Sequence, residues 1–213
     1  MASYFNLTLD TLAPQGLTIK LNNGSQYTTS KNVTLSISVS DTSTSGYQMK
    51  VWGIDGASSE DSASWETFAS TKSIALSTGD GLKTVYVKVR DDVFNETAAA
   101  SVNITLDTSV PAVTIIGPDV SRISKTAPKN VATFSFTSDV AFTEYKIKVV
   151  PSKSSLHDAG TLIGTMTATG AFKASTAISC KVYGKDLEAA SSGDGEKIIK
   201  VFVKNAHGTW SVA

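Results

Sequence analysis

The chain has 213 residues, enough for one large domain or two smaller ones. Its 19 basic and 19 acidic residues cancel at pH 7, and no Lys/Arg cluster stands out. This charge balance lacks the basic patch of a nucleic-acid binder and the polybasic stretch that binds membrane surfaces, so we expect neither partner. A single cysteine, Cys180, excludes an intrachain disulfide and lies in an alternating apolar run, which predicts a buried, inert thiol.

The first residues, MASYFNLTLD, have neither the charged start nor the apolar run of a signal peptide. No apolar stretch is long enough to cross a bilayer. We therefore expect a protein that is made in the cytoplasm and that works elsewhere only as part of a particle.

An internal repeat organises the chain. In chain order, four segments of the first half recur in the second: NLTLDTLAP (6–14) as NITLDTSVP (103–111), KNVTLS (31–36) as KNVATFS (129–135), YQMKVW (47–52) as YKIKVV (145–150), and GDGLKTVYVKV (79–89) as GDGEKIIKVFV (193–203). The repeat predicts two domains, residues 1–108 and 109–213. The last pair is offset further than the others, which predicts an insertion in the second domain around 151–170.

Within each copy, apolar residues alternate with polar ones, as expected of half-buried strands. No window of 11 residues shows a helical stripe, and clusters of Gly, Ser, Asn and Asp separate the runs. The pattern predicts an all-β protein of two tandem antiparallel β-sandwich domains. Because Pro111 follows a short linker, we expect an elongated pair of domains.

The motifs resemble those of bacterial and bacteriophage immunoglobulin-like repeats. LDTxxP precedes a domain, Trp65 and Phe68 form a WxxF pair, and VRDDVFNE (89–96) resembles the turn before the last strand of such repeats. Phe94 stands where that turn usually has Gly, whereas the second copy, VKNAHGTW (203–210), keeps Gly208 and loses the Asp. The resemblance covers nearly the whole chain and is specific for an immunoglobulin-like fold but weak for function. It implies an accessory or decoration protein of a tailed-phage virion, bound on the head, tail or baseplate.

Residues 4–10 have the sequence of a final strand, because their counterpart at 103–108 closes the first domain, and the sequence shows no domain before them. Two interpretations stay open. The segment pairs with an exposed sheet edge of another copy or of the protein it decorates, through Phe5, Leu7 and Leu9, or it is an ordinary first strand of the first domain.

Other candidate sites have a structural alternative each. Asp10, Asp91, Asp92 and Asn95 suggest a calcium site at one end of a sandwich, but the same residues are typical of side-chain-to-backbone turns. Trp52, Trp65 and Trp210 are candidate contacts for a partner or for a stacked sugar, whereas Tyr47 shares the face of core residues. Trp52 points to the opposite face, as an exposed contact or at the edge of the other sheet. The alternative for Trp65 is that it anchors the polar loop 58–64. His157 and His207 are expected to be exposed loop residues, since no metal or acid–base companions accompany them.

No catalytic motif occurs, so we expect no enzyme and no cofactor. The function that the sequence favours is a structural or decoration protein of a phage virion, in contact with virion proteins and other copies of itself. Its location would be the virion surface, after assembly in the host cytoplasm. The alternative is a surface adhesion module that binds host glycans.

Overall fold

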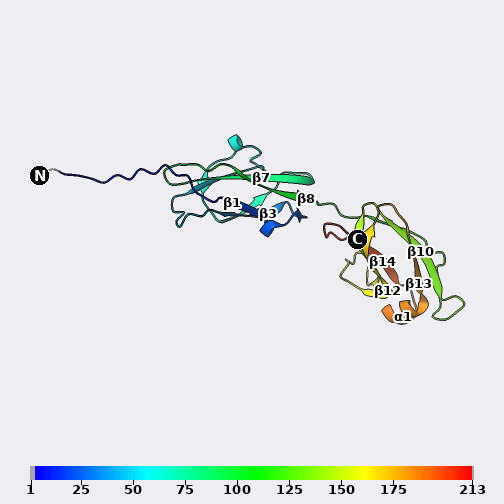
Figure 1. Ribbon diagram of the computed structural model, residues 1–213. Coiled ribbons are helices and arrows are strands. Elements are labelled where there is room, and N and C mark those ends of the chain that lie inside the picture. The colour runs from blue at the N-terminus through cyan, green and yellow to red at the C-terminus, as the bar shows by residue number, and fades with distance from the viewer. Residues whose placement is uncertain (1–2, 213) are drawn as a thin grey trace. The chain divides into compact units, whose positions relative to one another are not determined.

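The structure is a computed structural model that describes residues 3–212. The chain forms two compact units, divided between Thr108 and Ser109 (Figure 1). We call them unit 1 and unit 2. No helix in the described part of the chain is long and apolar enough to cross a membrane.

Unit 1 is built from two sheets that enclose one core. Its strands are β1 (Thr18–Leu21), β2 (Tyr27–Thr28), β3 (Asn32–Ser38), β4 (Gln48–Trp52), β5 (Glu66–Thr67), β6 (Thr71–Ala75), β7 (Gly81–Arg90) and β8 (Ala100–Leu106), with short 3-10 helices η1 (Asn22–Gly24) and η2 (Glu60–Ser62). One sheet has the order β1-β3-β6 and the other β2-β8-β7-β4-β5. All pairs are antiparallel except the short β2–β8 pair.

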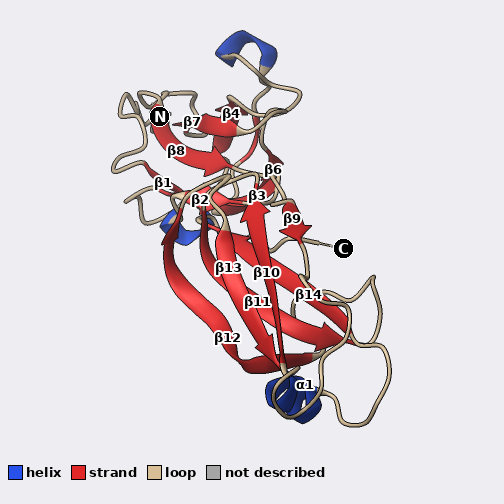
Figure 2. Cartoon of the chain, turned by 90° about the vertical axis from the view of Figure 1, so that its right-hand side faces the viewer, coloured by secondary structure: helices blue, strands red, loops and turns tan. Residues whose placement is uncertain are grey.

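Unit 2 repeats this plan with fewer strands (Figure 2). Its elements are β9 (Val113–Ile116), β10 (Val131–Ser138), β11 (Phe142–Val150), β12 (Thr161–Phe172), β13 (Ile178–Tyr183), α1 (Gly184–Ala190) and β14 (Ile198–Asn205). Its antiparallel sheets have the orders β9-β10-β13 and β12-β11-β14.

The alternation in the sequence explains both cores. Val33, Leu35 and Ile37 of β3 face inward and are at most 3% exposed, while the residues between them are partly or fully exposed. Phe134 and Phe136 of β10 do the same in unit 2. Each core joins side chains from both sheets of its unit, which is the arrangement of an immunoglobulin-like sandwich. The prediction of two antiparallel β-sandwiches is confirmed.

Cys180 lies in the core of unit 2, only 7% exposed, as the sequence predicted. Burial raises the pKa of its thiol above the ordinary value, so the thiolate, which is the reactive form, is disfavoured.

The extra length of unit 2 lies in two places rather than one. The connection between β11 and β13 carries the long strand β12, and the connection between β13 and β14 carries the helix α1. The sequence analysis expected the first addition but no helix. At seven residues, α1 is too short to produce the apolar stripe by which a helix is recognised, and only Gly184 within it is buried.

Residues 4–10 form no strand in either sheet of unit 1, so their interpretation as an ordinary first strand is wrong. The first strand of unit 1 is β1, which begins at Thr18. The physical reason is that β8, the segment whose sequence residues 4–10 share, already pairs with β7 along that edge of the sheet.

Candidate binding surfaces

The turns that follow β7 and β14 have the same hydrogen bonds. In unit 1 the Asp91 carboxylate accepts from the backbone N–H groups of Val93 and Asn95, at 3.0 and 2.8 Å. In unit 2 the Asn205 side-chain oxygen accepts from the N–H groups of His207 and Thr209, at 3.1 and 2.9 Å. Both are side-chain-to-backbone turns, built once with an acid and once with an amide.

The carboxylate of Asp91 is buried, and its second oxygen accepts from the Asn95 side-chain amide at 2.8 Å. Burial alone would raise the pKa of Asp91, but hydrogen bonds from Asn95, Val93 and Phe94 outweigh it and hold this pKa below the ordinary value. Both carboxylate oxygens of Asp91, which a calcium ion would need as ligands, thus already accept hydrogen bonds from N–H groups.

The other calcium candidates lie at the same end of unit 1. Asp10 contributes its backbone oxygen, 3.4 Å from the Asn95 side-chain nitrogen, and Asp92 is exposed. The pKa of Tyr47 is raised first by burial and then by the charges of Asp41, Asp91, Asp92 and Asp10. Within residues 3–212, however, no group of three His, Cys, Asp or Glu side chains is placed to hold a metal ion.

Two tryptophans lie on the outer face of the larger sheet of unit 1. Trp52 is 8% exposed and stacks on Tyr86, its partner across β4 and β7, with ring centroids 5.4 Å apart. The guanidinium of Arg90 lies between two rings, 4.3 Å from the centroid of Trp65 and 4.4 Å from that of Phe94. These contacts are cation–π interactions within the chain itself.

Trp210 belongs to unit 2 and is covered in a similar way. The ring of His157 stacks on it at 4.7 Å, and the ammonium group of Lys146 lies 4.5 Å from its centroid. The prediction that His157 and His207 are exposed loop residues is wrong, because both are half-buried. His157 is covered where the inserted loop folds back onto Trp210. The insertion has no counterpart in the first copy, so the repeat gave no indication of this stack.

The three candidate tryptophans therefore do not form one platform. Trp52 and Trp65 belong to unit 1 and Trp210 to unit 2, and each ring already packs against an aromatic or cationic side chain of the chain. A sugar that stacked on Trp65 or Trp210 would compete with these contacts.

The N-terminal candidates are, by contrast, fully accessible. Tyr4, Phe5, Leu7, Leu9 and Leu12 are between 74% and 90% exposed. The segment runs away from the sheets of unit 1 without helix or strand (Figure 1). We call residues 3–12 the N-terminal segment. Exposed apolar side chains of this size make the segment a candidate binding surface.

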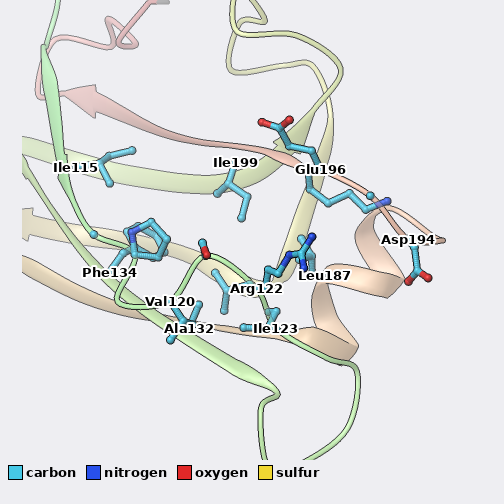
Figure 3. A pocket seen from close by; sticks show the side chains of 16 residues that line it. Ile115, Val120, Arg122, Ile123, Ala132, Phe134, Leu187, Asp194, Glu196 and Ile199 are labelled. Atoms are coloured by element: carbon cyan, nitrogen blue, oxygen red, sulfur yellow. The ribbon is translucent and has the colours of Figure 1, made fainter.

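Unit 2 contains a hollow of about 980 Å³ at the open side of β14 (Figure 3). Ile115 reaches it from β9 and Ile199 from β14, while Phe134 forms part of its floor. Arg122 and Glu196 are at its rim. Gly195 and Lys197, just before the start of β14, also line the hollow.

The same place in unit 1 is filled by β8. Ile104 and Leu106 of β8 lie opposite Lys83 and Gly81 of β7 and are only 1% and 2% exposed. When the two turns are superposed, Lys83 corresponds to Lys197 and Gly81 to Gly195. Lys197 and Gly195 line the hollow. Among the described residues, no strand pairs with β14 on the side away from β11. The hollow is therefore the site that a β8-like strand would occupy.

Sequence reasoning found the N-terminal segment but missed the hollow. Its lining comes from β9, the loop 117–123, α1 and the start of β14, which are far apart in the sequence. The available signal was the sequence match between residues 6–14 and 103–111.

Comparison with known proteins gives distant matches among solved structures. No family model matches the chain, and no curated protein does. Among solved structures, the fibronectin(III)-like modules of Clostridium thermocellum CbhA are 11% identical, with a TM-score of 0.46, over 92% of this chain and 90% of theirs. Chitinase ChiA74 from Bacillus thuringiensis is 10% identical, with a TM-score of 0.31, over 92% of this chain and 30% of its own. Matches this distant carry no conclusion about function, and the fold assignment rests on the strand order and the two cores.

Proposed function

We propose that this protein is a non-enzymatic structural component of a bacteriophage virion, held on the head, tail or baseplate surface by protein–protein contacts. The observation that carries the proposal is the N-terminal segment. Its large apolar side chains at every second position, Phe5, Leu7 and Leu9, are exposed. This alternation suits a strand that adds to the sheet of a partner.

Two further features support a role in binding rather than catalysis. The polar side chains that sequence reasoning singled out are engaged in structural contacts: Asp91 in a turn and His157 in a ring stack. The large hollow of unit 2 has a mixed lining: Ile115, Phe134 and Ile199 could receive apolar side chains, and charged residues, among them Arg122 and Glu196, also line it. The virion location rests on the resemblance of the sequence to immunoglobulin-like repeats of phages.

Mass spectrometry of purified virions from the phage that encodes the chain tests the location. We expect the protein in the particle fraction at a fixed stoichiometry, and imaging of particles from a deletion mutant should show the loss of a surface feature. Recovery of the protein only in the soluble fraction would contradict the proposal.

A variant connects this test to the segment. Leu7→Asp and Leu9→Asp together should abolish incorporation into particles, since charged side chains cannot enter an apolar site without loss of hydration. Asn6→Asp is the matched control, because Asn6 alternates with the apolar positions, and it should be incorporated normally.

A further inference from the structure

We infer that the N-terminal segment of one copy completes the sheet of unit 2 in a second copy, by antiparallel addition to the open edge of β14. The inference deepens the proposed function by naming the partner of the segment, and it rests on the segment being the attachment site. Three observations lead to it.

The donor segment has the sequence of the strand that fills the same place in unit 1. NLTLD at residues 6–10 corresponds to NITLD at 103–107 in β8. Leu7 matches Ile104 and Leu9 matches Leu106, the two β8 side chains that close the core of unit 1. Phe5 matches Val102, which packs against the same core.

The acceptor strand, β14, is the counterpart of β7, the strand with which β8 pairs in unit 1. Val203 of β14 receives a hydrogen bond from the Ser211 N–H at 2.8 Å, as Val89 of β7 does from the Thr97 N–H at 2.9 Å. The part of β7 before this point, Gly81–Val87, pairs with β8, whereas the matching part of β14 pairs, among the described residues, with β11 alone. A strand edge of this kind is a template for another chain.

The hollow supplies space for the side chains. Transferring the β7–β8 register to unit 2 places Leu9 opposite Gly195, Leu7 opposite Lys197 and Phe5 opposite Ile199. All three acceptor residues line the hollow. Ile115 of β9, 45% exposed, would be covered by the incoming side chains.

The transferred register also places Thr8 opposite Glu196, which lies at the rim of the hollow. Both are exposed in the free chain. Because donor and acceptor are different surfaces, each copy can give one strand and receive one. Such head-to-tail contacts build rings where they close and open chains where they do not.

Sedimentation velocity over a concentration series tests association. The protein should form larger species as its concentration rises, and Leu7→Asp should weaken association by more than about tenfold, the loss expected for one buried leucine. Asn6→Asp adds the same charge at an outward position and should have little effect. On the acceptor side, Ile115→Asp should weaken association as Leu7→Asp does.

A disulfide test fixes the register. Copies carrying Thr8→Cys are mixed with differently tagged copies carrying Glu196→Cys, and Cys180 needs no replacement because it is buried. The control acceptor is Thr165→Cys on β12, at the opposite edge of the same sheet. We expect a cross-linked heterodimer with the first acceptor and not with the second.

Equal cross-linking of both acceptors, or a protein that stays monomeric at every concentration, would overturn the inference. Failure of the proposed function is distinguishable from this. If the protein remains monomeric but Leu7→Asp still prevents incorporation into particles, the segment binds a different virion protein and only the copy-to-copy pairing is wrong.

Discussion

At the scale of single residues, the turns after β7 and β14 have the same hydrogen bonds but different titration behaviour. Asp91 is buried and ionisable, and Asn205 is buried and neutral. Because the pKa of Asp91 is lowered in the folded state, the unfolded chain binds a proton more readily than the folded chain does. The stabilisation is therefore present above the unfolded-state pKa of about 4 and is lost as the pH falls below it.

Asp91→Asn should reduce this acid sensitivity of unit 1 and should cost about 1–2 kcal/mol at pH 7, since two amide nitrogens would then face each other in place of the hydrogen bond from Asn95. Urea unfolding by tryptophan fluorescence measures it. A Trp210→Phe background leaves tryptophans only in unit 1. Equal pH slopes for Asp91→Asn and its parent would contradict the assignment.

Gly208 and Phe94 occupy the same position of the two turns and both have positive φ, 93° and 69°. An alanine at Gly208 would touch nothing within 4 Å, so its cost is purely one of backbone conformation. Gly208→Ala should destabilise unit 2 by about 1 kcal/mol. Gly170→Ala is the control, because Gly170 has no positive φ and an added methyl would make only ordinary contact with Phe172. Thermal unfolding that ranks the two variants equally would count against this explanation.

At the scale of elements, two lysines attach the inserted loop of unit 2 to the sheet. Lys148 is only 8% exposed and donates to the carbonyls of His157 and Ala159 at 3.0 and 2.9 Å. Lys200, its partner on β14, donates to those of Lys153 and Ser155. The loop therefore depends on cation-to-carbonyl hydrogen bonds.

Lys148→Met should destabilise unit 2 by about 1.5–3 kcal/mol, the range for hydrogen bonds from charged groups, and should speed amide exchange in residues 151–160. The exposed Lys173 gives the control variant Lys173→Met, which should change neither quantity. Unchanged exchange in the loop of Lys148→Met would show that packing on Trp210 alone holds it.

The N-terminal segment and β8 share a sequence but not an environment. Ile104→Ala should cost about 2–5 kcal/mol, because the side chain is 1% exposed in the core. Leu7→Ala should leave the stability of the dilute protein unchanged, because Leu7 is 87% exposed there. Urea denaturation at low concentration compares them, and a clear loss for Leu7→Ala would mean that the segment packs on its own copy.

Much of the element pattern could be predicted from the sequence, and the reasons are local. The alternation of apolar and polar residues at Val33–Ile37 indicates a strand with one buried face, and it depends only on neighbouring residues. The helix α1 and the stack of His157 on Trp210 were missed because they depend on contacts made by inserted segments, which have no matching copy. The candidate residues Asp91 and Asn95 were correctly grouped, since a turn brings near neighbours in sequence together.

At the scale of the whole molecule, the repeat is staggered. Unit 1 fills its sheet edge with β8. Among residues 3–212, the matching edge of unit 2 pairs with no strand and lies beside the hollow, and the N-terminal segment with the matching sequence is exposed. These features together are the basis of the proposed strand addition.

Amide hydrogen exchange at low and high protein concentration tests strand addition most directly. Strand addition predicts that the amides of residues 4–10 and the amides of Ile198–Val201 that point away from β11 become protected together as concentration rises, and that Leu7→Asp removes both protections. Exchange at these amides that stays fast and independent of concentration, or protection of one set without the other, would contradict it.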